Sequence, residues 1–318
     1  METLMELEAY KALSKDELVN RIKIAKREKN AVILAHNYQI LEVQHVADYC
    51  GDSLELSRIA AKTDSDVVVF CGVDFMAESA KILAPEKTVL LPEIKATCPM
   101  AQMVTPDALN RAKAEIPDAV VLAYVNTTAA VKALTDICCT SANASKIANS
   151  LGGRKILFVP DKNLAHYTRK VTGASIKAWD GFCFVHNMFT VADVKRARSA
   201  HPDAVFILHP ESPPEVIELA DEVFSTSGMA KYVANMKNED EKHRGVIIGT
   251  ETGLVNQLRE RYPDVGIWPL NEFAICGTMK LTTLDKVCWS IETGNHEITL
   301  SGDIIEKARA SLERMLEL

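Results

Sequence analysis

IPDAVVLAYVNTTAA occupies residues 116–130, and HPDAVFILHPESPPE occupies residues 201–215. Each stretch reads Pro-Asp-Ala-Val, continues as an apolar run and then changes abruptly to polar residues. A weaker copy, KNAVILAHNYQILEV, occupies residues 29–43. The apolar runs end at His36, Tyr124 and His209, which lie 88 residues (36 to 124) and 85 residues (124 to 209) apart. The chain therefore contains one predicted strand three times, each time with a different polar end.

Three further features recur at a similar interval. Serine-containing segments follow the strands: GDSLELS with Ser53, CTSANAS with Ser141, and FSTSGMA with Ser225 and Thr226. A second apolar run in each repeat closes on an acid, and we call these the strand-end acids: Asp74, Asp161 and Glu251. Each repeat finishes in a loop with a cysteine: Cys98, Cys183 and Cys276. Self-similarity of this kind indicates a repeated structural unit.

The apolar runs predict the fold class. They are rich in Val, Ile and Leu, which is typical of parallel strands buried on both faces. They alternate with helical patterns such as SLELSRIAAK (53–62), so each repeat is expected to be a three-layer αβα unit. We predict an α/β protein with three pseudo-symmetric αβα domains around a central active site. The expected divisions are an N-terminal helical extension (1–20), αβα repeats (21–105, 106–190 and 191–290) and a C-terminal helical segment (291–318).

Composition narrows the function classes. The formal net charge is −7, and no basic stretch is dense enough to follow a phosphate backbone, which argues against a nucleic-acid partner. Residues 1–30 are charged throughout and lack the apolar core of a secretion signal. No apolar run approaches the roughly 20 residues of a membrane span. We therefore expect a cytoplasmic protein, in which the eight cysteines do not form a disulfide framework.

The repeated polar ends predict one shared site. Parallel α/β sheets bind ligands outside the carboxyl ends of their strands, and three domains around a pseudo-threefold axis would bring three such ends together. Cys98, Cys183 and Cys276 would then converge on the same cavity. Three thiolates can hold zinc, although structural zinc sites usually contain closely spaced cysteine pairs. They can also hold an iron–sulfur cluster, which normally takes four cysteines, and one iron would stay open as a Lewis acid.

The other polar residues have both a structural and a functional interpretation. The serine segments lie at predicted helix starts, where they either bind phosphate and carboxylate groups or cap the helix. We interpret the strand-end acids as structural residues that cap helices. His36 and His209 are either buried structural histidines or ligands. Glu211 follows His209 by two residues at one strand end, and the two are a candidate acid/base pair.

Short motifs along nearly the whole chain resemble those of the quinolinate synthase family: AHNYQ, GDSLELS, GVDFMAE, ATCPMA, YVNTTA, TSANA, HPE and NEFAICGTMK. The resemblance implies three pseudo-symmetric αβα domains around a site with an oxygen-sensitive [4Fe–4S] cluster. The implied reaction condenses iminoaspartate (iminosuccinate) with dihydroxyacetone phosphate to quinolinate, phosphate and water, within de novo NAD biosynthesis. An L-aspartate oxidase or an aspartate dehydrogenase would supply the imine.

The resemblance also assigns roles, motif by motif. It implies that Cys98, Cys183 and Cys276 ligate the cluster. The residues implied to bind substrate carboxylates, phosphate or intermediates are His36, Ser53, Tyr124, Asn126, Ser141, His209, Glu211, Ser225 and Thr226. Tyr38 and Glu211 are the candidates for proton transfer, and His186 and His209 are further catalytic candidates.

Other functions remain open on the residues alone. An iron–sulfur hydro-lyase would use an open iron to dehydrate a small hydroxy-acid and would need no phosphate subsite. A non-catalytic sensor of iron or oxygen would be expected to carry a nucleic-acid-binding segment, and the sequence offers none. A zinc-binding structural protein would be colourless and insensitive to air.

Overall fold

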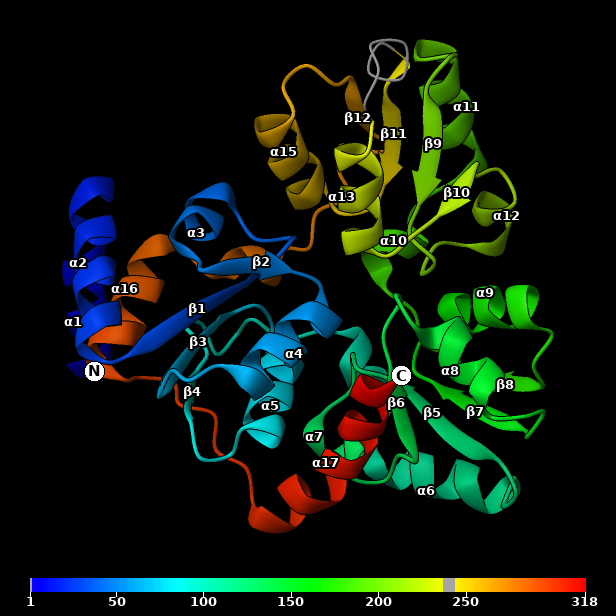
Figure 1. The fold of residues 1–318 in the computed structure, drawn as a ribbon, viewed down its shortest axis with the longest axis horizontal. Helices are drawn as coiled ribbons and strands as arrows, with labels where there is room; N and C mark the ends of the chain where they lie inside the picture. The colour runs from blue at the N-terminus through cyan, green and yellow to red at the C-terminus, as the bar shows by residue number, and fades with distance from the viewer. Residues whose placement is uncertain (1, 237–243) are drawn as a thin grey trace.

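The computed structural model describes residues 2–236 and 244–318. Within these ranges it contains three four-stranded sheets, which form three lobes around a common centre (Figure 1). The strand orders are β2-β1-β3-β4, β6-β5-β7-β8 and β10-β9-β11-β12, and all of the strand pairs in these ranges are parallel. The predicted α/β class with three pseudo-symmetric αβα units is therefore confirmed.

We call the three sheets with their helices the first, second and third units. The first has β1 (Ala31–His36), β2 (Tyr49–Gly51), β3 (Val67–Cys71) and β4 (Thr88–Leu90). The second has β5 (Val120–Tyr124), β6 (Ile137–Cys139), β7 (Ile156–Val159) and β8 (Ile176–Ala178). The third has β9 (Val205–Leu208), β10 (Glu222–Val223), β11 (Val246–Gly249) and β12 (Ile267–Pro269).

Helices connect and cover these strands. In the chain before β5 they are α1 (Glu2–Lys11), α2 (Lys15–Glu28), α3 (Leu41–Val46), α4 (Ser53–Lys62), α5 (Asp74–Leu83), the 3₁₀ helix η1 (Met100–Met103) and α6 (Pro106–Glu115). Between β5 and β9 they are α7 (Ala129–Lys132), α8 (Ala144–Ser150), α9 (Lys162–Thr172), α10 (Phe184–Asn187) and α11 (Val191–Ala200). After β9 they are α12 (Pro214–Ile217), α13 (Thr226–Ala234), α15 (Thr252–Arg261), the 3₁₀ helix η2 (Met279–Leu281), α16 (Leu284–Thr293) and α17 (Gly302–Glu317).

Burial explains why the apolar runs become strands. All residues of β5, VVLAY, are buried, and β-branched side chains pack well on such a pleated surface. Each run ends where polar residues begin, so the polar residues stand at the carboxyl edge of the sheet. Crossover helices start beyond that edge, as parallel topology requires.

The last two helices of the chain, α16 and α17, pack against units that precede them in the sequence. α16 follows the third unit in the chain but packs against α2 and β3 of the first, where Tyr10 Oη donates to Glu292 at 2.7 Å and Arg21 Nε donates to the same carboxylate at 2.8 Å. α17 packs against α5, α7 and β6 through buried Leu312 and Met315, so it bridges the first and second units. The exact domain limits stay a prediction.

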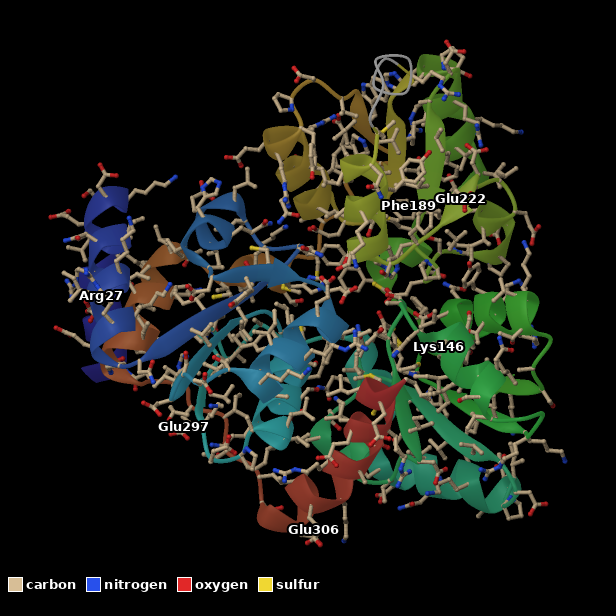
Figure 2. All side chains as sticks on the ribbon, viewed as in Figure 1. Arg27, Lys146, Phe189, Glu222, Glu297 and Glu306 are labelled. Atoms are coloured by element: carbon tan, nitrogen blue, oxygen red, sulfur yellow. The ribbon has the colours of Figure 1, made fainter. Side chains whose placement is uncertain are left out.

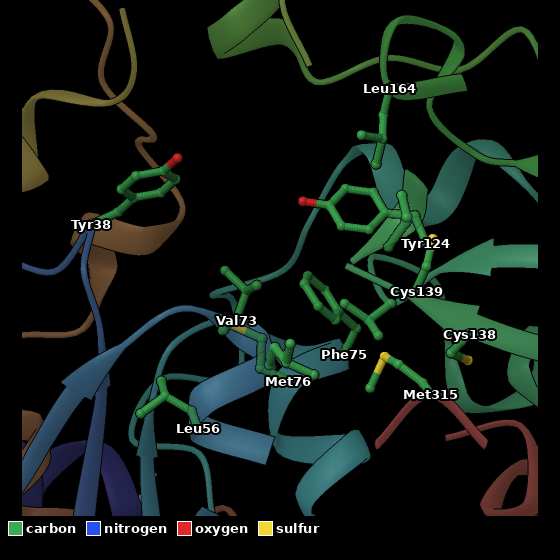
Figure 3. Packing of buried hydrophobic residues seen from close by; sticks show 14 of the residues in the cluster. Tyr38, Leu56, Val73, Phe75, Met76, Tyr124, Cys138, Cys139, Leu164 and Met315 are labelled. Atoms are coloured by element: carbon green, nitrogen blue, oxygen red, sulfur yellow. The ribbon is translucent and has the colours of Figure 1, made fainter. Parts of the chain in front are cut away.

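The largest hydrophobic cluster includes residues from all three sheets, such as Phe70, Leu122 and Ile248. Figure 3 shows part of it, with Phe75 of the first unit on the side that faces Tyr124 and Cys139 of the second. Charged side chains such as Arg27 and Glu306 lie at the edge of the molecule (Figure 2) and are exposed. None of the helices in residues 2–236 and 244–318 has the length and hydrophobicity to cross a bilayer.

Candidate functional site

One cavity lies where the carboxyl ends of the sheets meet. It contains these residues singled out from the sequence: His36, Tyr38, Ser53, Cys98, Tyr124, Asn126, Ser141, Cys183, His186, His209, Glu211, Thr226 and Cys276. Ser225 is not part of its lining. It caps α13 instead, accepting a hydrogen bond from Gly228 N at 3.2 Å. The chain therefore brings the candidates from all three units together, while their individual roles stay predictions.

A set of hydrogen bonds crosses the cavity, and we call it the relay. Tyr38 Oη lies 2.7 Å from Thr250 Oγ1, which lies 2.9 Å from His186 Nε2. His186 Nδ1 lies 2.7 Å from Glu211 Oε2, and Tyr124 Oη donates to the other oxygen of Glu211. Tyr38 and Tyr124 enter from opposite sides of the cavity (Figure 3). Because Tyr38 follows β1, Tyr124 ends β5 and Glu211 follows β9, the relay joins all three units.

The relay places hydrogen-bond donors around one buried carboxylate, that of Glu211. Burial raises the pKa of Glu211, but the electrostatic interaction with His186 and the hydrogen bonds from His186 and Tyr124 lower this pKa by more, so it lies below its ordinary value. Glu211 is therefore ionised at neutral pH. Burial and then the Glu211 charge raise the pKa of Tyr38 and of Tyr124 well above the ordinary value. Both phenols keep their protons, and Tyr124 donates its proton in the hydrogen bond to Glu211.

The two strand-end histidines are neutral. Burial, together with the charge of Lys280, lowers the pKa of His36 to about 3, and burial with His186 lowers that of His209 to about 3. His36 Nδ1 accepts a hydrogen bond from Tyr38 N at 3.2 Å. A neutral ring that accepts at Nδ1 carries its hydrogen on Nε2. His36 therefore has a donor available for an oxygen of a ligand, while its Nδ1 bond serves the structure. The His209 ring stacks on His186 at 4.4 Å between centroids.

Three cysteines of the cavity come from equivalent loops. Cys98 precedes η1, Cys183 precedes α10 and Cys276 precedes η2. All three are free thiols of intermediate exposure, and burial is the first cause that raises the pKa of each, to about 12 for Cys98. The remaining cysteines do not line the cavity: Cys50, Cys71, Cys138, Cys139 and Cys288. Neutral thiols lose their protons when a metal binds, so this donor set suits a soft metal centre.

A mixed donor set lies beside these thiols. Cys183, His186 and Glu211 place a sulfur, a nitrogen and a carboxylate oxygen within 4.8 Å of one another. The cysteine sulfur is 3.3 Å from His186 Nδ1. Thiolate, imidazole and carboxylate are the protein ligands of transition metals, so the cavity is a candidate metal-binding site.

Comparison with known proteins identifies the family. The sequence model of a family described as "Quinolinate synthetase A protein" matches residues 20–317. The quinolinate synthase of Methanoregula boonei is 52% identical over 293 residues, which cover 92% of this chain and 95% of the relative. That of Methanosarcina barkeri is 49% identical over 300 residues (94% and 97%), and that of Thermodesulfovibrio yellowstonii is 50% identical over 301 residues (94% and 98%). The chain belongs to the quinolinate synthase family.

Family membership confirms the resemblance inferred from the motifs. It supports an enzyme of NAD biosynthesis, and it does not support the hydro-lyase, sensor or structural zinc alternatives.

In the first and third serine segments, one residue caps the helix and the next residue faces the cavity. Asp52 caps α4 by accepting from Leu54 N and Glu55 N, both at 3.0 Å, so Ser53 is free to face the cavity. In the same way Ser225 caps α13, and Thr226 lines the cavity, where its Oγ1 accepts from Asn37 Nδ2 at 3.0 Å. Two long helices of this quinolinate synthase family member thus begin at the cavity, and helix N-termini favour anions.

Asn126 presents a buried acceptor to the cavity. Its Oδ1 atom is buried in the cavity and has no hydrogen-bond partner within residues 2–236 and 244–318. A buried acceptor without a partner costs about 1–3 kcal/mol. A bound ligand or water with a donor group would remove that cost.

Two participants were not singled out from the sequence. Thr250 joins Tyr38 to His186, and its only signal is its place at the end of β11, in GVIIGTETG. Asp52 is buried and belongs to the cavity lining; its signal is its position directly before a predicted helix. The strand-end acids Asp161 and Glu251 cap α9 and α15 as expected. Asp74 differs, because it is the first residue of α5 and Val73 holds the cap position.

Proposed function

We propose that this chain is a quinolinate synthase, a transferase that condenses iminoaspartate with dihydroxyacetone phosphate. The products are quinolinate, phosphate and two molecules of water. The observation that carries the proposal is one cavity in which three free cysteines, two helix N-termini and the relay meet. Each group answers a need of the reaction, which must hold a metal centre, bind two carboxylates and a phosphate, and move protons at several carbon atoms.

Cys98, Cys183 and Cys276 would hold a [4Fe–4S] cluster. The donor set fits, because the three thiols are free and line one cavity, and no other cysteine of the described residues lines it. Bound by three cysteines, such a cluster has one iron without a protein ligand, which supplies a Lewis acid for a carboxylate or a leaving hydroxyl. Free thiols in all eight positions also suit a reducing compartment, so we propose that the enzyme works in the cytoplasm.

The helix starts would bind the charged groups of the substrates. Ser53 and Thr226 stand at the first positions of α4 and α13, where their hydroxyls and their own backbone N–H groups suit a carboxylate or a phosphate. Ser141 and the amide of Asn126 add donors from the second unit. The Nε2–H of His36 adds a neutral donor, which binds an oxygen without placing a second positive charge in the cavity.

Glu211 and Tyr38 would move protons. Glu211 is ionised and buried, so it is the group of the relay that can accept a proton from a carbon acid or an amine. His186 holds one Glu211 oxygen and Tyr124 the other, which fixes the carboxylate in the cavity. Tyr38 keeps its phenolic proton and can donate it to a departing hydroxyl. An L-aspartate oxidase or an aspartate dehydrogenase would supply the imine.

The test is an anaerobic assay for quinolinate. Iminoaspartate is generated in the reaction, dihydroxyacetone phosphate is added, and quinolinate is measured by chromatography. We expect product only with both substrates, one phosphate released per quinolinate, and no product from the Cys98→Ala variant. Dehydration of a small hydroxy-acid without dihydroxyacetone phosphate, or no quinolinate from protein with a full cluster, would overturn the proposal.

A further inference from the structure

In each unit the cysteine loop is tied to a strand-end acid. The backbone N–H of the cysteine donates a hydrogen bond to the strand-end acid of the same unit. This acid follows the third strand of the unit in chain order, which is β3, β7 or β11. The pairs are Cys98 N with Asp74 Oδ1 at 3.2 Å, Cys183 N with Asp161 Oδ2 at 3.1 Å, and Cys276 N with Glu251 Oε1 at 3.1 Å. These carboxylates are far from their cysteines in sequence, so three equivalent contacts are a property of the fold rather than of a local turn.

A second hydrogen bond fixes each loop from the other side. The carbonyl two residues before the cysteine accepts from a backbone N–H at the first position of the helix. The pairs are Asp74 N with Ala96 O at 2.8 Å, Lys162 N with Gly181 O at 2.8 Å, and Thr252 N with Ala274 O at 2.9 Å. The contact in the second unit is so close that a Cβ at position 181 would lie 2.5 Å from Pro160 O. Each loop is therefore held at two points directly before its thiol.

We propose that the strand-end acids are positioning residues, which hold the three cysteine loops in the arrangement that a shared metal centre needs. The inference rests on the proposed function, since it takes the three cysteines as cluster ligands. Groups that orient metal ligands are worth about 10- to 100-fold in metal affinity.

The units differ in how the carboxylate is used, and this difference makes the proposal testable. Asp161 accepts from Leu164 N through Oδ1 and from Cys183 N through Oδ2. Glu251 likewise uses one oxygen for Gly253 N and the other for Cys276 N. An amide side chain has only one acceptor oxygen. Asp161→Asn and Glu251→Gln therefore have to give up either the cap or the cysteine contact and set an NH₂ group against a backbone N–H.

Asp74 provides the matched control. Its Oδ1 alone accepts from both Phe75 N at 2.8 Å and Cys98 N at 3.2 Å. Asp74→Asn can keep both hydrogen bonds through its single carbonyl oxygen, whereas Asp74→Ala loses both. The same chemical change thus breaks the contact in two units and preserves it in the first.

The surroundings of the acids predict which variant matters most. Lys280 lies 2.9 Å from Glu251, so this carboxylate has an ionic partner that also helps to hold it in place. Asp161 is fully buried, and no salt bridge to it is found in the part of the chain that the structure describes. Its position depends on backbone N–H donors alone. We expect the largest effect from Asp161→Asn.

The experiment measures iron release from anaerobically reconstituted protein to an Fe(II) chelator. We expect Asp161→Asn and Glu251→Gln to release iron about 10- to 100-fold faster than the wild type, with Asp74→Asn at the wild-type rate. Asp161→Glu restores two acceptor oxygens, as in the third unit, and should recover most of the loss. Ser301→Ala removes the cap of α17, which lies 25 residues after Cys276 and whose hydrogen bond is to Ile304 N. It controls for a lost cap alone and should release iron at the wild-type rate.

The outcomes separate the two proposals. Wild-type protein that takes up no iron and sulfide would refute the proposed cluster and this inference with it. If the wild type forms the cluster, and Asp161→Asn and Glu251→Gln release iron no faster than the wild type does, the positioning role alone is refuted. Circular dichroism reports whether each variant is folded, and if Asp161→Asn is not, Glu251→Gln against Asp74→Asn decides the question.

Discussion

The first and third units use the same strand for different chemistry. β1 and β9 hold the same place in their sheets, and both are almost wholly buried. β1 ends in His36 and leads to Tyr38, while β9 leads to His209 and Glu211. A strand interior has to be apolar because a buried polar side chain there would need a partner. The strand end faces the cavity, so it can change without cost to the sheet.

Replacing Glu211, which follows β9, should have the largest effect. Glu211→Gln removes the buried anion of the relay while keeping its shape, and we expect kcat for quinolinate formation to fall about 10²- to 10⁴-fold, as for a lost general base. The rate is measured anaerobically at saturating substrates, with iron content determined on the same sample. A variant with full iron content and kcat close to that of the wild type would remove Glu211 from the chemistry.

A substitution inside a strand should lower the stability of the protein and leave kcat unchanged. Leu122 is fully buried in β5, and Leu122→Ala leaves a cavity, so the free energy of unfolding should fall by about 2–5 kcal/mol. Urea denaturation measures this loss, and kcat per folded molecule should stay close to that of the wild type. Unchanged stability with a lost kcat would mean that strand interior and strand end are not separable.

The neutral histidines should make the protein sensitive to acid. The folded-state pKa of His36 and of His209 is about 3, against an ordinary value of 6.5. As the pH falls below 6.5, the unfolded chain binds protons that the folded chain does not, so stability is lost. From pH 7 to pH 5 this amounts to about 2 kcal/mol for each histidine. His209→Gln should lose about 2 kcal/mol less than the wild type over that interval in urea titrations; an equal loss would contradict the pKa.

The smallest effects should separate two serines of equivalent segments. Ser225→Ala removes the cap of α13 and should lower the free energy of unfolding by about 1 kcal/mol, with little change in KM. Ser53 does not cap α4, so Ser53→Ala should leave stability unchanged and raise KM about 10-fold, as for a lost hydrogen bond to a charged group. Thermal unfolding and steady-state kinetics on both variants test this. A loss of stability in Ser53→Ala together with a raised KM in Ser225→Ala would contradict these two roles.

The fold was predictable because it depends on short-range pattern. Apolar runs such as VVLAY and their recurrence at a similar interval define three parallel sheets without any knowledge of contacts. The packing of α16 on the first unit was not predictable in this way. It depends on contacts such as Tyr10 with Glu292, and no pattern within either segment indicates the other.

The site was predictable where it follows the strand ends and hidden where it depends on register or on packing between units. His36, Tyr124 and Glu211 could be placed because each follows an apolar run. Thr250 could not, because its partners come from elsewhere in the chain. Shifts of a single residue also decide roles, as at Asp74, which stands one position past the helix cap. Sequence spacing does not resolve one residue of register.

The most direct test of the central claim is the iron and sulfide content of anaerobically purified protein beside Cys98→Ala, with visible spectra of both. About four irons and a matching amount of sulfide per chain, with a broad absorption that air bleaches and that the variant lacks, is the predicted result. Colourless wild-type protein that cannot be reconstituted, or a Cys98→Ala variant that keeps its full cluster, would contradict the claim that three equivalent loops hold one metal centre.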